Sequence, residues 1–260
     1  MTGKRVDFLV AGVQKAGTTA LFDYLAELPG LELPAVKEAH FFDEEETVDW
    51  SAPDYALYHA LFRDETRLWG EATPIYLYWP GALERIRAYN PAIKLVLIFR
   101  DPVERAWSHW KMEYARGKET QPFAWCIRQG RARMAEGSPY PGFHRVYSYV
   151  ERGFYGRQLA RVLDLFPREQ LLLLESGQLQ RDPTATIRTV CRFLGIDAPE
   201  GAIPAKVSRP AAEIDYSATL TEQDVIFLQR QFREEMARLE SLAQGDALFG
   251  WTRPIRFPSK

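Results

Sequence analysis

The sequence predicts an α/β fold in which a central parallel sheet is flanked by helices, giving three layers. Three short and almost continuous apolar runs have the length and character of buried parallel strands: VDFLVA at 6–11, KLVLIFR at 94–100 and LLLL at 171–174. Segments with helical periodicity lie between these runs. Such alternation is typical of a parallel sheet with helices on its faces.

Apolar spacing and end signals mark the helices. Leucines at 21, 25 and 28 follow the first run, and apolar residues at 159, 162, 163 and 166 precede the third. Asp182 followed by Pro183 is typical of a helix N-terminus, and we expect that helix to end at Gly195. Thr221 and Asp224 have the spacing of a capping box ahead of a long amphipathic helix.

Two segments, 31–69 and 121–150, fit this alternation poorly. Both are rich in aromatic residues, prolines and charges, so we expect them to be insertions that face a substrate. No linker or change of composition divides the chain. We therefore expect residues 1–260 to form one domain.

Composition excludes several classes of protein. The 260 residues are 46% hydrophobic and 26% charged, which is ordinary for a globular protein, and the net charge of -2 gives no global attraction to nucleic acid or an anionic membrane. The apolar runs are too short for a secretion signal or a membrane span, so we expect a cytoplasmic protein without membrane insertion. The four histidines do not have the spacing of metal ligands, so we expect no metal site. Nothing indicates an oligomeric state.

The stretch GVQKAGTT at 12–19 is close to a phosphate-binding loop. It keeps both glycines of the G-x-x-x-x-G-K-[ST] pattern, but Thr18 stands where that pattern has lysine, and Lys15 comes three residues early. Backbone N–H groups at the start of the following helix suit an anion, Gly17 permits close approach, and the Thr18 and Thr19 hydroxyls add donors. The alternative is an ordinary strand-to-helix turn with a solvated lysine. The missing lysine argues against ATP with Mg²⁺.

A second candidate anion site is FRDPVERAWS at 99–108. The strand at 94–100 delivers Arg100 to its carboxyl end, where open α/β sheets bind ligands, and the helix that starts at Pro102 carries Ser108 about two turns further on. Arginine offers a phosphate two parallel hydrogen bonds. The alternative is that Arg100 only pairs with Asp101 or Glu104.

Two further motifs accompany the stretches at 12–19 and 99–108: KEAHFFD at 37–43 and GFYGRQL at 153–159. The four motifs and their order resemble the family of sulfotransferases that use 3′-phosphoadenosine 5′-phosphosulfate (PAPS), in particular the heparan-sulfate branch and its bacterial relatives. The resemblance runs from about 6 to 196. It implies a P-loop-like fold and a metal-independent reaction. It also implies that PAPS binds with its 5′-phosphosulfate on Lys15, Ala16, Gly17, Thr18 and Thr19 and its 3′-phosphate on Arg100 and Ser108.

The resemblance also implies roles in catalysis. Lys15 would stabilise charge on the departing phosphate, and Glu38 would be the general base. His40 would orient the acceptor or serve as an alternative base, and Asp43 would orient a neighbour or the acceptor. Ala72 stands where the glycosaminoglycan branch has an assisting lysine, so we expect the neighbouring Glu71 to orient Lys15 or the acceptor.

Three further residues match nucleotide-contacting positions of the family. Tyr155 matches an aromatic residue near the nucleotide, although core packing explains it equally well. Lys206 and Arg209 fall where relatives carry a basic loop over the 3′-phosphate, with a solvated surface loop as the alternative.

The expected function is therefore transfer of a sulfuryl group from PAPS to a hydroxyl, in preference to an amine, of a carbohydrate or a small-molecule natural product. A nucleotide kinase of related fold would need a Walker-type lysine and a magnesium-binding acid, and neither is apparent. A nucleotide-binding module without catalysis is the remaining alternative. The sequence does not identify the acceptor.

Overall fold

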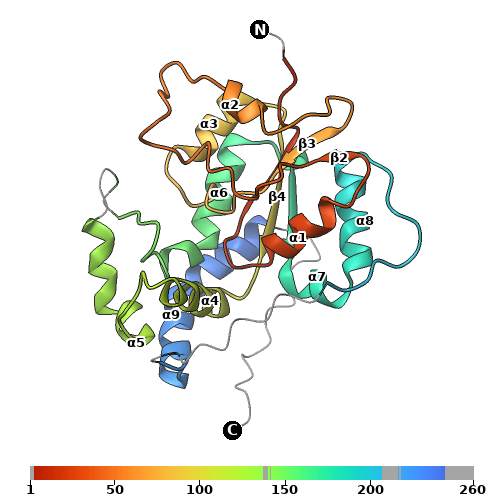
Figure 1. Ribbon diagram of the computed structural model, residues 1–260. Coiled ribbons are helices and arrows are strands. Elements are labelled where there is room, and N and C mark those ends of the chain that lie inside the picture. Colours follow the sequence, from red (N-terminus) through yellow and green to blue (C-terminus); the bar gives the residue numbers. More distant parts are fainter. Residues whose placement is uncertain (1–2, 137–139, 141, 207–215, 217, 244–260) are drawn as a thin grey trace.

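A computed structural model describes residues 3–136, 140, 142–206, 216 and 218–243, and its central feature is one five-stranded sheet (Figure 1). Every neighbouring pair of strands is parallel, in the order β2-β3-β1-β4-β5. The α/β fold with a central parallel sheet is thus confirmed. The strands are β1 (Phe8–Gly12), β2 (Leu31–Glu32), β3 (Leu68–Glu71), β4 (Lys94–Phe99) and β5 (Leu171–Glu175).

Helices connect these strands and cover the sheet. The α-helices are α1 (Thr18–Leu25), α2 (Ala56–His59), α3 (Ala82–Tyr89), α4 (Pro102–Ala115), α5 (Phe123–Cys126), α6 (Tyr155–Leu165), α7 (Ser176–Arg181), α8 (Pro183–Leu194) and α9 (Glu222–Leu242). Three 3₁₀ segments are η1 (Gln129–Glu136), η2 (Glu151–Gly153) and η3 (Arg168–Gln170). Within the described ranges, none of the helices has both the length and the apolarity that a membrane span needs.

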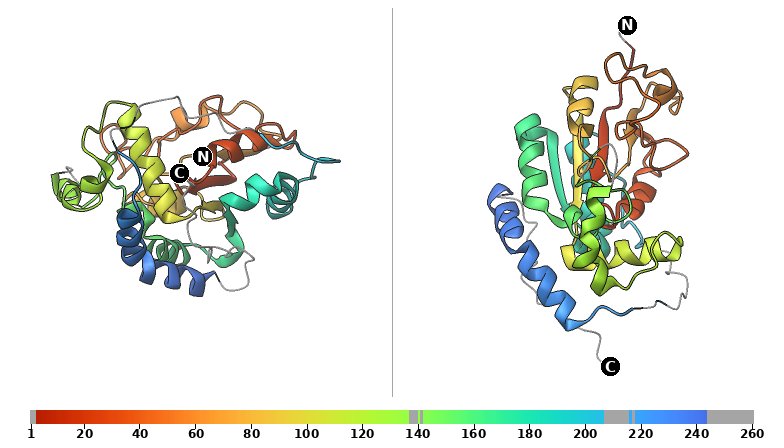
Figure 2. Two further views of the ribbon diagram at one scale, coloured as in Figure 1. Left: turned by 90° about the horizontal axis from the view of Figure 1, so that it is seen from below. Right: turned by 90° about the vertical axis from the view of Figure 1, so that its left-hand side faces the viewer.

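The three strands expected from apolar runs are β1, β4 and β5, which lie next to one another. Leu9 pairs with Leu95, and Leu97 in turn pairs with Leu173. Every residue of β1 is buried, because helices cover both faces of the sheet. Figure 2 shows α6 on one face, with α9 outside it, and α1 on the other.

The two remaining strands correct the prediction for 31–69, because both ends of this segment belong to the sheet. β2 has two residues, and β3 has the sequence LWGE. β2 is too short to give a strand signal, and β3 gives only a weak one, a short strand-like segment before Glu71. Gly70 in β3 is required by close packing, since a Cβ atom there would lie 2.0 Å from Cζ of Phe8. Only the part between β2 and β3 is an excursion from the sheet.

The helix-end signals are confirmed. The Asp182 side chain accepts a hydrogen bond from the Ala185 N–H and so caps α8, which ends at Gly195 with a φ of 82°. At α9, Thr221 and Asp224 form both hydrogen bonds of a capping box. Asp101 caps α4 in the same way as Asp182 caps α8, and this cap fixes the direction in which the chain leaves β4.

Candidate functional site

The loop between β1 and α1 has the geometry of an anion site. Gly17 is the N-cap of α1 with a φ of 95°, a conformation that glycine adopts without strain. No side chain caps α1, so the N–H groups of its first turn have no side-chain acceptor. These groups and the helix dipole favour a bound anion. Ala16 and Thr18 are buried in the loop, and Thr19 is exposed.

Arg100, at the end of β4, lies against this loop. Its Nη1 donates to the backbone carbonyl of Lys15 at 3.3 Å. The guanidinium also pairs with Glu104, with an Nη2–Oε2 distance of 3.0 Å, as the alternative interpretation predicted. Such an exposed pair contributes about 0–1 kcal/mol, so a phosphate can replace it at little cost. The structure brings Lys15 and Arg100 into one site.

The Lys15 side chain has no fixed partner in the part of the chain that the structure describes. Among the described residues, none lies within hydrogen-bond or ion-pair distance of its ammonium. Burial lowers the pKa of Lys15, and the nearby cations Arg116 and Arg100 lower it further. An incoming anion would reverse this effect. Ser108, also expected to bind phosphate, is half-buried on α4, and its hydroxyl has no partner in the described part of the chain.

The segment 37–43 places an imidazole between two carboxylates. His40 Nδ1 lies 3.0 Å from Asp43 Oδ2, and His40 Nε2 lies 3.6 Å from Glu38 Oε2. Hydrogen bonds to Asp43 and Glu38 raise the pKa of His40 to about 9. Burial alone would raise the pKa of Glu38, but His40 and Lys37 outweigh it and hold the value at about 2. At neutral pH the histidine is therefore protonated and the glutamate ionised.

Glu71 lies behind this segment and holds its backbone, and its expected role in orienting Lys15 or the acceptor stays a prediction. Its side chain is buried and accepts hydrogen bonds from the Ala39 N–H at 3.3 Å and from the Thr73 hydroxyl. Burial raises the pKa of Glu71 to about 7. Ala72 is also buried, and its carbonyl accepts from the Glu38 N–H at 3.1 Å. β3 thus fixes the backbone that carries the predicted base.

Backbone strain coincides with the predicted catalytic residues. In the described ranges, the residues other than glycine with positive φ are Lys15 at 70°, Glu38 at 66° and His40 at 53°. Such conformations cost of order 1–3 kcal/mol each and concentrate at functional sites. This observation is independent of the motifs that selected the same three residues.

Sequence reasoning missed a network of arginines behind the site. Arg145 binds the buried Asp43 carboxylate, and its own carbonyl accepts from Arg152 Nη2 at 2.8 Å. Arg152 is 1% exposed and also donates to Ser148 Oγ at 2.7 Å and to the Gln14 side chain. The network therefore links the residue before Lys15 to the Glu38–His40–Asp43 segment. The only sequence signal is that Arg152 directly precedes the GFYGRQL motif.

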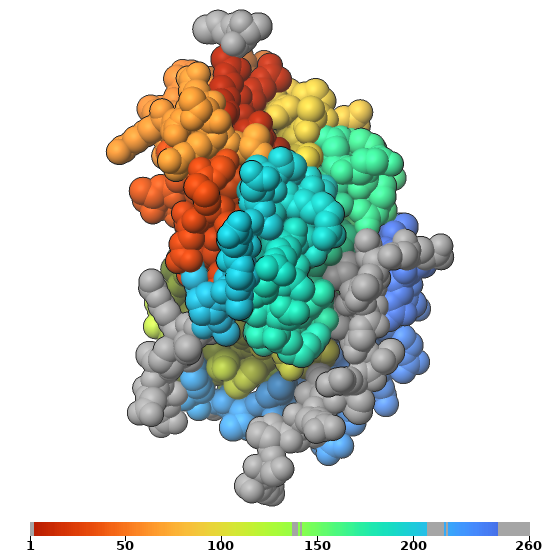
Figure 3. All heavy atoms as spheres, turned by 90° about the vertical axis from the view of Figure 1, so that its right-hand side faces the viewer, coloured from red at the N-terminus to blue at the C-terminus, as the bar shows by residue number. Residues whose placement is uncertain are grey.

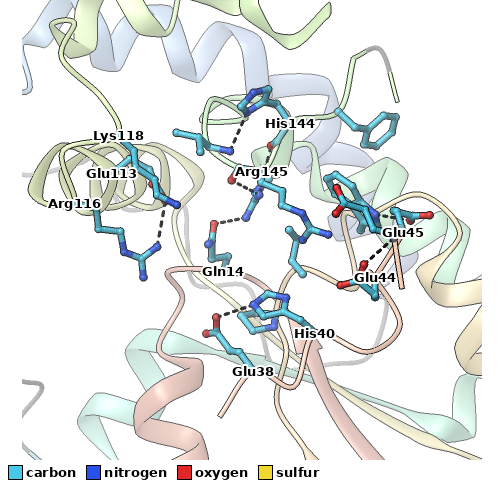
Figure 4. Close-up of a pocket in the computed structure, with 17 residues that line it drawn as sticks. Gln14, Glu38, His40, Glu44, Glu45, Glu113, Arg116, Lys118, His144 and Arg145 are labelled. Carbon is cyan, nitrogen blue, oxygen red and sulfur yellow. Dashed lines mark hydrogen bonds and ion pairs between the residues drawn. The ribbon is translucent and has the colours of Figure 1, made fainter. Parts of the chain in front are cut away.

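A pocket of about 790 Å³ is lined by Glu38, His40 and residues of the arginine network, whereas Lys15 and Arg100 do not line it (Figure 4). Figure 4 shows Glu38 and His40 on one side of it and Glu113, Arg116 and Lys118 on another. Both segments expected to face a substrate contribute to its wall. The lining residues are Gln14, Glu38, His40, Glu44, Glu45, Glu46, Pro74, Ile75, Trp79, Glu113, Arg116, Lys118, Phe143, His144, Arg145, Val146 and Arg152.

Two residues expected at the nucleotide are held by contacts within the protein. Tyr155 is fully buried, and its hydroxyl donates to the Arg100 carbonyl at 3.1 Å, so core packing explains its position. Lys206 Nζ contacts Asp23 O at 2.6 Å and Glu27 Oε1 at 2.7 Å. These contacts lie near the C-terminal end of α1, which attracts cations, whereas the anion site lies at its N-terminus. Figure 3 shows the segment after α8 beside α1. Arg209 lies outside the described residues.

The site combines a basic phosphate-type loop after β1 with Arg100 at the end of the neighbouring strand β4. This combination is typical of an α/β protein that binds a nucleotide or phosphate. Comparison with known proteins identifies the family: residues 5–211 match the sulfotransferase domain model. The chain belongs to the sulfotransferase family.

Individual relatives agree with this assignment. The chain is 29% identical to heparan sulfate glucosamine 3-O-sulfotransferase 3A1 of Mus musculus over 198 residues, which are 72% of this chain and 45% of that protein. It is 29% identical to the 3-O-sulfotransferase 6 of Homo sapiens over 193 residues, 72% of this chain and 52% of that protein. The chain thus spans about half the length of these curated relatives.

Solved structures share the fold. A sulfotransferase from Alicyclobacillus acidocaldarius superposes with a TM-score of 0.77 at 28% identity, covering 94% of this chain and 98% of that one. Mouse SULT7A1 complexed with PAP superposes with a TM-score of 0.52 at 15% identity, covering 91% and 85% of the two chains, which shows the fold alone.

Proposed function

We propose that the chain is a single sulfotransferase domain that transfers a sulfuryl group from PAPS to a hydroxyl of a carbohydrate or small-molecule acceptor. One observation supports the proposal most directly. Lys15, which has no partner among the described residues, and the strand-end Arg100 meet at an uncapped helix N-terminus, near a pocket that contains Glu38. Heparan sulfate glucosamine, named for two relatives, supports a carbohydrate acceptor.

The residues at the loop suit the donor. The N–H groups at the start of α1 and the Lys15 ammonium would hold the 5′-phosphosulfate, and Arg100 with Ser108 would hold the 3′-phosphate. When bound, PAPS supplies the sulfuryl group, and 3′-phosphoadenosine 5′-phosphate (PAP) is left. Lys15 would stabilise the negative charge that develops on that leaving phosphate. A cation without another partner serves this purpose best.

Glu38 would take the proton of the acceptor hydroxyl. It is ionised at neutral pH, whereas His40 is protonated and so unable to act as a base. His40 instead would orient Glu38 by binding it and Asp43 at once. Because the pKa of Glu38 is low, we expect proton transfer to accompany bond formation, when the acceptor oxygen becomes acidic.

Binding and transfer assays test this proposal. We expect PAP, but not ATP with Mg²⁺, to raise the melting temperature. We also expect labelled-sulfate transfer from PAPS across an acceptor panel of p-nitrophenyl glycosides, phenols and amino alcohols, with loss of transfer in Glu38→Gln. No shift at saturating PAP would refute the proposal. A shift without transfer to any acceptor would leave a nucleotide-binding module.

A further inference from the structure

Glu113, on the last turn of α4, is a buried acid with one uncommitted oxygen. It is 3% exposed and lines the pocket that also contains Glu38. Arg116 Nη1 lies 3.5 Å from Glu113 Oε1, and His109 Nε2 lies 3.8 Å from the same oxygen. Glu113 Oε2 has no hydrogen-bond partner in the described part of the chain.

A buried carboxylate oxygen without a partner, in a residue that lines a pocket, is unusual. Buried polar atoms in folded proteins almost always have a partner, because burying one without a hydrogen bond is costly. The cost is recovered if a ligand brings an O–H or N–H group to this oxygen. Since an ionised carboxylate only accepts hydrogen bonds, the ligand group must be a donor.

The other carboxylates of the pocket differ from Glu113. Glu45 is fully engaged, because Trp79 and Arg85 donate to Oε1 while Arg85 and Tyr140 donate to Oε2. Glu44 is only half-buried and accepts two backbone N–H groups on Oε1, and Glu46 is exposed.

Glu113 also lies near the reacting groups. Both Glu113 and Glu38 oppose the lowering of the Lys15 pKa, so both carboxylates act on the same ammonium. Burial raises the pKa of Glu113 itself, which is consistent with a site that lacks sufficient donors until a ligand arrives. The pocket thus presents two acids beside Lys15: Glu38, already paired, and Glu113, with one oxygen open.

We propose that Glu113 determines acceptor specificity by accepting a hydrogen bond from a second hydroxyl or an ammonium group of the acceptor. The acceptor then carries at least two donors, the hydroxyl that is sulfated and the group that binds Glu113 Oε2. This inference rests on the proposed function and narrows its acceptor to polyols, sugars or amino alcohols.

Steady-state kinetics with Glu113→Gln test the inference. The matched control is Glu240→Gln, which loses the same charge at an exposed position on α9 that does not line the pocket. The probe is the panel compound that the unmodified protein sulfates fastest, together with its monodeoxy or deamino analogues. We expect Glu113→Gln to raise the acceptor KM about tenfold or more and to leave the PAPS KM unchanged. Glu240→Gln should change neither.

The analogues separate contact from a structural effect. The analogue that lacks the donor group bound by Glu113 should have the same KM with the unmodified protein and with Glu113→Gln, because its hydrogen bond to Glu113 is already absent. A change in acceptor KM below twofold, or an equal loss with every analogue, would overturn the inference. Melting temperatures of the variant with and without PAP test its fold and donor site. Absence of a PAP shift in the unmodified protein would instead refute the proposed function, and this inference with it.

Discussion

The loop that would hold the donor and the pocket that would take the acceptor lie against each other, yet they are built differently. The donor side consists of backbone N–H groups and two cations, delivered by the ends of β1 and β4. The acceptor side is a network of side chains in which Glu38, His40, Asp43 and Arg145 hold one another in place. The donor side therefore depends on local geometry, and the acceptor side on contacts between distant segments.

This difference predicts that Lys15 substitution has the largest effect on the reaction. Lys15→Ala removes the one cation proposed to act on the leaving phosphate, so we expect sulfuryl transfer to fall at least about 100-fold, or about 3 kcal/mol. The loop backbone remains, and PAP should still raise the melting temperature. A loss below tenfold, measured with labelled PAPS, would show that the backbone alone suffices.

The acceptor side should show a pH dependence of its own, which His40 sets. His40 has a raised pKa of about 9, so its ion pairs with Glu38 and Asp43 stabilise the fold fully below pH 6.5 and are lost as pH rises through about 9. We expect the transfer rate and the free energy of unfolding to fall together in that range. His40→Asn should remove this dependence of the free energy. If the variant keeps it, another group is responsible.

Arg152 tests whether the two sides are coupled. Arg152→Lys keeps the charge, but a single ammonium cannot reproduce the contacts to Gln14, Ser148 and the Arg145 carbonyl. We expect kcat to fall about tenfold while the melting shift with PAP is retained. The exposed Arg157→Lys, on α6, is the control. An Arg152→Lys rate equal to that control would indicate that the sides act independently.

Lys206 should matter least. Its ammonium is engaged by Asp23 and Glu27 at the far end of α1 from the anion site. We expect Lys206→Ala to leave the affinity for PAP unchanged and to alter the free energy of unfolding by no more than about 1 kcal/mol. A fall in PAP affinity by tenfold, measured by calorimetry, would restore the role expected from the family resemblance.

The same contrast explains what the sequence could and could not predict. β1, β4 and β5 are long enough to show as apolar runs, whereas β2 and β3 are short and one contains Gly70. Lys15 and Arg100 follow strands directly, so their meeting at one sheet edge follows from the strand assignment.

The arginine network was not predictable in this way. Arg152 and Gln14 are 138 positions apart, and Arg145 and Asp43 are 102 apart, so only the tertiary fold shows that they meet. The partners of Lys206 were not predictable either, because no sequence pattern shows that a loop lysine binds Glu27 at the C-terminal end of α1.

The most direct test of the account compares PAP with adenosine 5′-phosphate, which lacks the 3′-phosphate. Affinities measured by calorimetry for the unmodified protein and Arg100→Ala separate the two ends of the ligand. If Lys15 and Arg100 hold opposite ends, Arg100→Ala should weaken PAP binding by at least tenfold and leave adenosine 5′-phosphate binding unchanged. Equal weakening of both ligands, or of neither, would contradict the account.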